Sequence, residues 1–163
     1  MRTSLAIPAV FCVFLFLFNC CTSAMAKEKL VPGTQVAREL KVKSGGKDVT
    51  MRFWQFVPKG YDGKKKFPFM LFLHGAGERG DKLEVVKKWG PPKLVGKRKD
   101  FPFVLISPQC PRNTWWKIEE LYQLVNKVAG ELKIDRQRMY VTGLSMGGFG
   151  SWLLMDRYPK LFA

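Results

Sequence analysis

Residues 143–147 (GLSMG) form the segment best suited to covalent chemistry, because a serine lies there between two glycines. An apolar strand candidate, residues 139–142, leads into this segment, and a helix candidate follows it. A tight strand-to-helix turn projects a serine hydroxyl from the edge of a sheet, and glycines on either side avoid a clash with the flanking strand and helix. The spacing therefore predicts Ser145 as a nucleophile, with Gly143 and Gly147 as the glycines that the turn requires.

A plain glycine-rich turn or a phosphate-binding loop would also place glycines between a strand and a helix. A Walker loop carries lysine and then serine or threonine directly after its last glycine. Here Phe149 and Gly150 follow Gly148. The phosphate-binding alternative fails on this point, and the plain turn remains the alternative to a nucleophile.

A serine that attacks a carbonyl also needs hydrogen-bond donors for the oxyanion that develops. The backbone N–H of Met146, at the start of the following helix, is the first predicted donor. Residues 74–80 (HGAGERG) follow another apolar run and offer a second donor. Ala76 is predicted to supply it, with Gly75 as the alternative, because small residues let the backbone approach the substrate carbonyl.

Hydropathy patterns predict the elements that must position these groups. Alternating residues 36–57 on either side of a turn at 44–47 predict a β-hairpin. Continuous apolar runs predict buried strands at 67–73 and 103–106, the second stopped by Ser107-Pro108. Strands that alternate with helices belong to the α/β class, with parallel strands and crossover helices.

Helices are predicted at three places. Apolar residues at offsets of three and four predict one helix from Ile118 to Leu132. A shorter helix is expected at 81–89, ended by the Gly-Pro-Pro run at 90–92. The helix after Ser145 is expected to bury Phe149, Trp152 and Leu153 and to end at Pro159.

Together these motifs resemble the α/β-hydrolase superfamily, and within it secreted carboxylesterases, phospholipases and prolyl-oligopeptidase-like esterases. The resemblance rests on residues 74–80 (HGAGERG), 107–111 (SPQCP) and 140–148 (YVTGLSMGG), and it covers residues 36–163. It implies a serine hydrolase of small-molecule or polysaccharide-linked carboxylic esters that forms an acyl-enzyme, without a cofactor or metal. A prolyl-oligopeptidase-like serine peptidase, or a non-catalytic remnant or binding protein, is the alternative.

The resemblance also implies an aspartate and then a histidine after the nucleophile, and here the chain departs from the family. After Ser145 the only acid is Asp156, expected to be an exposed helix charge, and no histidine follows. His74, the only histidine, is expected to be structural, since family members carry such a histidine beside the oxyanion loop. We therefore expect only the N-terminal part of an α/β-hydrolase fold, apparently truncated after the nucleophile turn, with little activity as it stands.

The N-terminus reads as a signal peptide. Arg2 precedes an apolar run that leads to the small-x-small pattern at 24–26, and charged residues follow at once. The run is too short for the roughly 20 apolar residues of a membrane-spanning helix, so no stable membrane anchor is expected. Cleavage after Ala26 predicts a secreted or periplasmic protein whose partial hydrolase domain comprises residues 27–163.

Charge and cysteines limit the other possibilities. The formal charge of +15 would suit nucleic acid, but lysines are spread between apolar runs without a nucleic-acid motif, so no such partner is expected. Three of the four cysteines lie within 1–26, which leaves Cys110 either buried or without its partner. Trp115 and Trp116 are expected to pack in a core or lid, or alternatively to stack on a substrate.

Overall fold

The computed structural model describes residues 30–98 and 100–163, so the expected signal peptide at 1–26 lies outside the described residues. Its sheet has five strands in the order β1-β2-β4-β3-β5. β1 (Gln35–Ser44) and β2 (Lys47–Phe56) form the expected antiparallel hairpin. β3 (Phe67–Leu73) is parallel to both β4 (Val104–Pro108) and β5 (Ile134–Gly143). The predicted α/β class, hairpin and parallel strands are confirmed.

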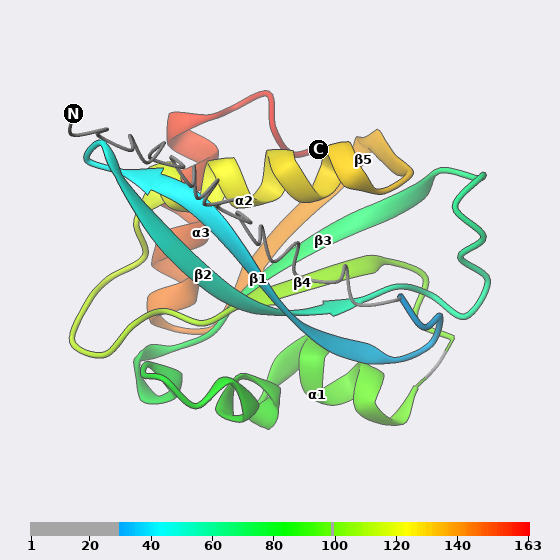
Figure 1. Ribbon diagram of the computed structural model, residues 1–163, viewed down its shortest axis with the longest axis horizontal. Helices are drawn as coiled ribbons and strands as arrows, with labels where there is room; N and C mark the ends of the chain where they lie inside the picture. Colours follow the sequence, from blue (N-terminus) through cyan, green and yellow to red (C-terminus); the bar gives the residue numbers. More distant parts are fainter. Residues whose placement is uncertain (1–29, 99) are drawn as a thin grey trace, which may run out of the picture.

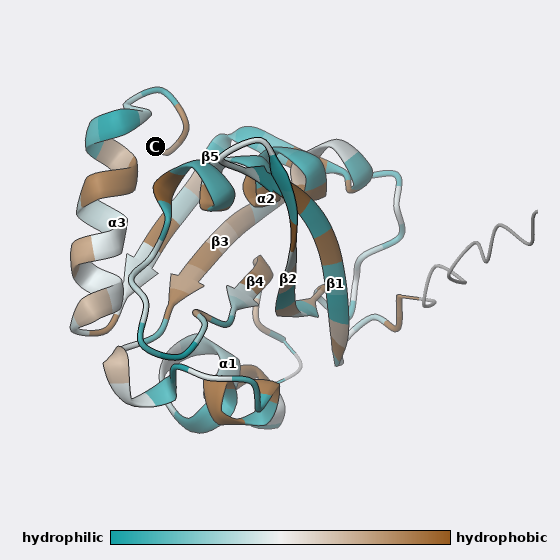
Figure 2. Cartoon of the chain, turned by 60° about the vertical axis from the view of Figure 1, so that its left-hand side comes forward, coloured by the Kyte–Doolittle hydropathy of each residue, from teal (hydrophilic) through white to brown (hydrophobic). Residues whose placement is uncertain are grey.

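Helices cover both faces of the sheet (Figures 1 and 2). α1 (Gly90–Lys97) packs on one face, where Val95 joins a small cluster with Phe56, Phe72 and Leu105. α2 (Ile118–Glu131) and α3 (Met146–Arg157) lie on the other face over the main core. α2 is the predicted amphipathic helix, and it buries the stripe that its spacing indicated.

Both later strands are longer than their apolar runs. β4 continues through Ser107 and Pro108, which were expected to stop it, because β2 pairs antiparallel with it as far as Phe53 opposite Pro108. β5 begins at Ile134, and its pairing with β3 shifts register between Phe67 and Phe69. Pairing with a neighbouring strand, rather than hydrophobicity alone, sets these ends.

The expected helix at 81–89 is wrong in type and in its end. Leu83–Lys88 form a 3-10 helix, η2, and Gly90 with the two prolines begins α1 instead of ending a helix. Proline is well tolerated in the first helical turn, where its missing N–H would have no intrahelical acceptor. Trp89, in an extended conformation, separates the two helices.

The expected buried face of α3 is also wrong. Phe149, Trp152 and Leu153 are 66%, 73% and 54% exposed. The helix turns small residues toward the sheet instead, burying Gly147, Gly150 and Ser151 between Met146 and Leu154. Small residues allow α3 to approach β3 closely, so size rather than hydrophobicity selects its inner face. Pro159 follows the end of the helix, as predicted.

Candidate active site

Ser145 lies on an exposed turn between β5 and α3 in an unusual backbone conformation. Its φ of 50° and ψ of −114° place a non-glycine residue where L side chains are strained. Hydrogen bonds on both sides hold the turn: Leu144 N–H donates to Leu73 O at 3.0 Å, and Gly148 N–H donates to Ser145 O at 2.8 Å. β3 and the first turn of α3 thus fix the geometry from which the hydroxyl projects.

The two glycines of the turn are required by close backbone approach. A Cβ on Gly143 would lie 2.2 Å from the carbonyl carbon and oxygen of Gly147. A Cβ on Gly147 would lie 1.8 Å from Leu73 O. Both contacts are with backbone atoms, which cannot rotate away. The geometry thus agrees with the spacing argument for both positions.

The predicted oxyanion loop lies against this turn. Ala76–Glu78 form a short 3-10 helix, η1, directly after β3. A Cβ placed on Gly75 would be 3.7 Å from Ser145 Cβ, so the two loops are in near contact. Ala76 and Met146 are the first residues of η1 and α3, positions whose N–H groups have no acceptor within their own helix. The fold therefore brings Ser145, Met146, Gly75 and Ala76 into one region.

His74 is buried beneath the loop, and both of its ring nitrogens are engaged. Cys110 N–H donates to Nε2 at 3.0 Å, so Nδ1 carries the proton and donates to Gly75 O at 2.7 Å. Burial lowers the pKa of this imidazole, and the neutral tautomer is the one that fits its partners. This geometry supports the expected structural role, and His74 has no free nitrogen to offer Ser145.

The same hydrogen bond orients the predicted oxyanion donor. In a trans peptide the C=O and the following N–H point in opposite directions. Because Gly75 C=O points at the His74 ring, the Ala76 N–H of the same peptide points away from it. The hydrogen bonds from Cys110 N–H to the His74 ring and from the ring to Gly75 O are linked, and linked hydrogen bonds polarise one another. This strengthens the Ala76 N–H as a donor.

Two residues without a role in the sequence analysis hold the loop. Arg79 Nε donates to Ala76 O at 3.0 Å and its Nη1 donates to Thr114 O at 3.1 Å. Gln109 is buried and donates from Nε2 to Glu78 O at 3.1 Å. Both residues belong to motifs that carry the family resemblance, but only the folded contacts show what they bind.

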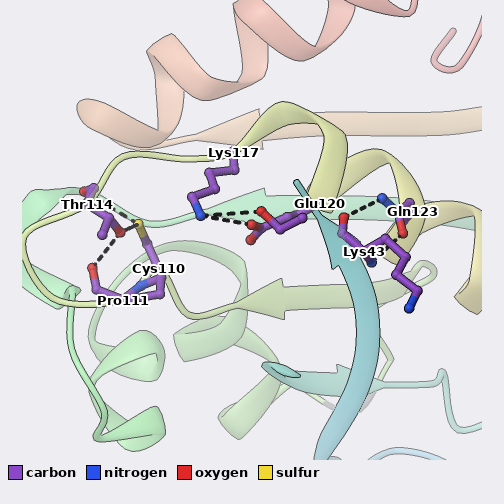
Figure 3. Close-up of polar contacts among 8 residues, drawn as sticks. Lys43, Cys110, Pro111, Thr114, Lys117, Glu120 and Gln123 are labelled. Atoms are coloured by element: carbon purple, nitrogen blue, oxygen red, sulfur yellow. Dashed lines mark hydrogen bonds and ion pairs between the residues drawn. The ribbon is translucent and has the colours of Figure 1, made fainter. Parts of the chain in front are cut away.

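The segment after β4 completes this support (Figure 3). Cys110 is buried, its Sγ lies 3.4 Å from Thr114 Oγ1, and Thr114 in turn donates to Pro111 O. Burial raises the pKa of the Cys110 thiol. Of the two expected outcomes for this cysteine, burial is the one observed.

Trp115 and Trp116, expected either to pack in a core or lid or to stack on a substrate, differ in their burial. Trp116 is 7% exposed, packs edge-on against the His74 ring, and donates from Nε1 to His74 O. Trp115 is 62% exposed. Trp116 is therefore part of the core, and only Trp115 is free to meet a ligand.

The remaining points concern Asp156, metal ligands and membrane-spanning helices. Asp156 is exposed on α3, as predicted. Within residues 30–98 and 100–163, no group of three histidine, cysteine, aspartate or glutamate side chains is arranged to hold a metal ion. No helix in this described part is both long and apolar enough to cross a membrane.

Solved structures share this fold. No protein-family model and no curated protein matches the sequence. A thermostable esterase is 30% identical, with 78% of this chain and 39% of that chain covered and a TM-score of 0.61. A ferulic acid esterase is 24% identical over 79% of this chain and 55% of that chain, with a TM-score of 0.55. A Bacteroides ovatus protein of the dipeptidyl aminopeptidase IV type is 18% identical over 78% and 20%, with a TM-score of 0.53.

The chain thus spans well under two thirds of the length of each of these proteins. The described residues therefore form part of an α/β-hydrolase fold, and the chain resembles the esterases that are built on this fold.

Proposed function

We propose that this chain belongs to a secreted serine hydrolase of carboxylic esters. The observation that carries the proposal is the strained, exposed Ser145 next to Met146 and close to Ala76, two residues that begin helices. Similarity to the thermostable esterase and the ferulic acid esterase supports the ester as the bond that is cleaved. Export rests on the sequence of residues 1–26, with cleavage after Ala26 and a secreted or periplasmic location.

In the proposed reaction, Ser145 Oγ attacks the ester carbonyl and its proton passes to a base. The N–H groups of Met146 and Ala76, with Gly75 as the alternative to Ala76, donate to the oxyanion. Collapse of the tetrahedral intermediate breaks the bond to the alcohol oxygen, which takes up a proton and leaves. Water then hydrolyses the acyl-enzyme. The reaction requires no cofactor or metal, and the substrate is a small-molecule or polysaccharide-linked ester.

Turnover by these 163 residues alone is proposed to be low. The only histidine, His74, is committed to Cys110 and Gly75, and Asp156 is an exposed residue of α3. A hydrolase without a triad member retains only about 10³- to 10⁴-fold acceleration over water, from the oxyanion hole and binding. A slow acylation of Ser145, rather than rapid turnover, is the expected activity.

Covalent labelling tests the nucleophile. The purified chain is incubated with a fluorophosphonate for hours at mildly alkaline pH, and mass spectrometry locates the adduct. We expect phosphonylation of Ser145, none at that position in Ser145→Ala, and unchanged labelling in Thr142→Ala, which removes an exposed hydroxyl from neighbouring β5. Equal total labelling of the wild type and Ser145→Ala would refute the assignment and favour a non-catalytic remnant.

A serine peptidase is the second candidate, because the Bacteroides ovatus protein of the dipeptidyl aminopeptidase IV type shares the fold. Acylation by a 4-nitrophenyl ester and by the 4-nitroanilide of the same acyl group separates the two. The ester hypothesis expects acylation of Ser145 by the ester only. Comparable acylation by the anilide would favour the peptidase.

A further inference from the structure

Basic side chains gather at the edge of the sheet opposite to Ser145. β3 and β5 are parallel neighbours, so the segments that lead into them meet at their shared amino end, on the right-hand side of Figure 1. Residues 64–66 are three consecutive lysines before β3, and two further basic residues lie at the start of β5. The exposed side chains of this amino-edge patch are those of Lys64, Lys65, Lys66, Lys133 and Arg136.

Backbone and ring contacts fix the two segments of the patch to each other. Phe67 N–H donates to Lys133 O at 2.9 Å, which places Lys66, the residue before Phe67, beside Lys133. Lys133 N–H donates to Tyr61 Oη at 3.0 Å, and the rings of Tyr61 and Phe67 pack with their centroids 5.4 Å apart. The patch is therefore built by the fold and does not depend on the run of three lysines alone.

The charge of the patch is not offset by ion pairs. Of the described residues, none forms an ion pair with the five side chains. The two acids of these segments have other partners, since Asp62 accepts from backbone N–H groups of its own turn and Asp135 pairs with Arg138 at 2.8 Å. By contrast, Arg112 and Lys117, which follow the carboxyl end of β4, each pair with an acidic side chain. The amino-edge patch thus keeps its charge available for an anionic partner.

The composition of the patch indicates the chemistry of that partner. Lysine ammonium groups are point charges on flexible stems, which suits separate anionic groups along a polymer better than one planar group held at two points. None of the large exposed apolar side chains of the described chain lies in segments 57–67 or 132–138, whereas binding to a lipid surface depends on buried apolar area as well as charge. The same segments present no exposed aromatic ring on which a nucleic-acid base could stack. An acidic polysaccharide fits these features better than a membrane or a nucleic acid.

We propose that the amino-edge patch binds an acidic polysaccharide, one whose sugar units carry carboxylate or sulfate groups. The net charge of +15 adds a long-range attraction for such a polymer. β3 has seven residues at about 3.3 Å each, so the patch lies about 20 Å from the loop at the carboxyl end of the strand. The site is therefore separate from the serine turn, and the inference goes beyond the proposed function without depending on it.

Titration calorimetry with dextran sulfate tests the proposal, with unmodified dextran as the neutral polymer of the same backbone. We expect the chain to bind dextran sulfate and not dextran. Binding should weaken as salt rises from about 0.01 M to about 0.15 M, because the Debye length falls from about 30 Å to about 8 Å. The triple variant Lys64→Gln, Lys65→Gln, Lys66→Gln loses three exposed ion contacts and should bind about tenfold more weakly, which corresponds to about 1.4 kcal/mol.

A second triple variant separates the patch from the net charge. Lys41→Gln, Lys47→Gln and Lys88→Gln remove the same charge from exposed lysines of β1, β2 and η2. This variant should weaken binding less than about twofold, since it changes only the long-range field. Circular dichroism of both variants verifies that they are folded.

Equal weakening by the two triple variants would overturn the patch as the binding site, because net charge alone would then explain the binding. Absence of binding to dextran sulfate at the lower salt concentration would overturn it as well. Tighter binding to duplex DNA, or to vesicles that contain phosphatidylglycerol, than to dextran sulfate at equal concentrations of anionic groups would refute the polysaccharide as the partner.

Discussion

Substituting the two adjacent glycines at the start of α3 should have opposite effects on stability. A Cβ on Gly147 would lie 1.8 Å from Leu73 O and 2.4 Å from Leu73 C. A Cβ on Gly148 has its nearest contact, Gly143 O, at 3.7 Å, an ordinary van der Waals distance. Gly147→Ala and Gly148→Ala therefore add the same methyl group to the same helical turn in two different environments.

The expected magnitudes follow from these distances. Overpacking typically costs about 1–3 kcal/mol, and the overlap at Gly147 is with backbone that cannot rotate away, so the cost should reach at least about 3 kcal/mol. Gly148→Ala meets no clash and replaces a flexible residue within a helix, which should stabilise the protein by about 0.5–1 kcal/mol. The difference of roughly 4 kcal/mol is a large part of the 5–15 kcal/mol typical of a domain.

Urea denaturation followed by far-ultraviolet circular dichroism measures both free energies of unfolding. Tryptophan fluorescence, to which the buried Trp54 and Trp116 contribute, provides a second probe of the same transition. A Gly147→Ala variant within about 0.5 kcal/mol of the wild type, the range of neutral surface changes, would refute the close approach of α3 to β3. A Gly148→Ala variant as damaging as Gly147→Ala would show that the turn rejects any added methyl group, contrary to the geometry described.

Three further predictions concern the support beneath the proposed oxyanion loop. Burial lowers the pKa of His74 below its ordinary 6.5, so the unfolded chain binds the proton more readily than the folded one, and the free energy of unfolding should fall as the pH drops below about 6.5. Urea midpoints measured between pH 7.5 and 4.5 should decrease accordingly, and the decrease should be smaller in His74→Gln. Trp116→Ala should lower the free energy of unfolding by about 3–5 kcal/mol, whereas Trp115→Ala should change it by less than about 0.5 kcal/mol; similar values for both would contradict their burial. Cys110, buried and with a raised thiol pKa, should react with a disulfide reagent at pH 8 much faster in urea than in buffer, and equal rates would show that the thiol is accessible in the folded chain.

The sequence by itself determined the hairpin, the three parallel strands, α2 and the location of the serine turn. These features follow from local information, since hydrophobic periodicity fixes which residues can form a buried strand or an amphipathic helix. The requirement for glycine at positions 143 and 147 could also be predicted, because a tight strand-to-helix connection has no room for side chains there. The proposed roles of Gly75 and Ala76 rest on the same reasoning about small residues, applied to the loop near the proposed nucleophile.

Tertiary structure alone decided which face of α3 is buried and how the loop at residues 74–80 is held. Phe149, Trp152 and Leu153 have the hydrophobicity of core residues, but the inner face of α3 has room only for small ones: the β3 backbone at Leu73 crowds Gly147, and the Trp116 ring crowds Gly150. Such a distance between elements is not encoded in any local pattern.

The contacts beneath the loop are equally non-local. Arg79 reaches Thr114, and Cys110 donates to His74 across more than thirty positions of sequence. Hydropathy identifies which segments become strands and helices, whereas hydrogen bonds between distant loops depend on where the sheet places their ends.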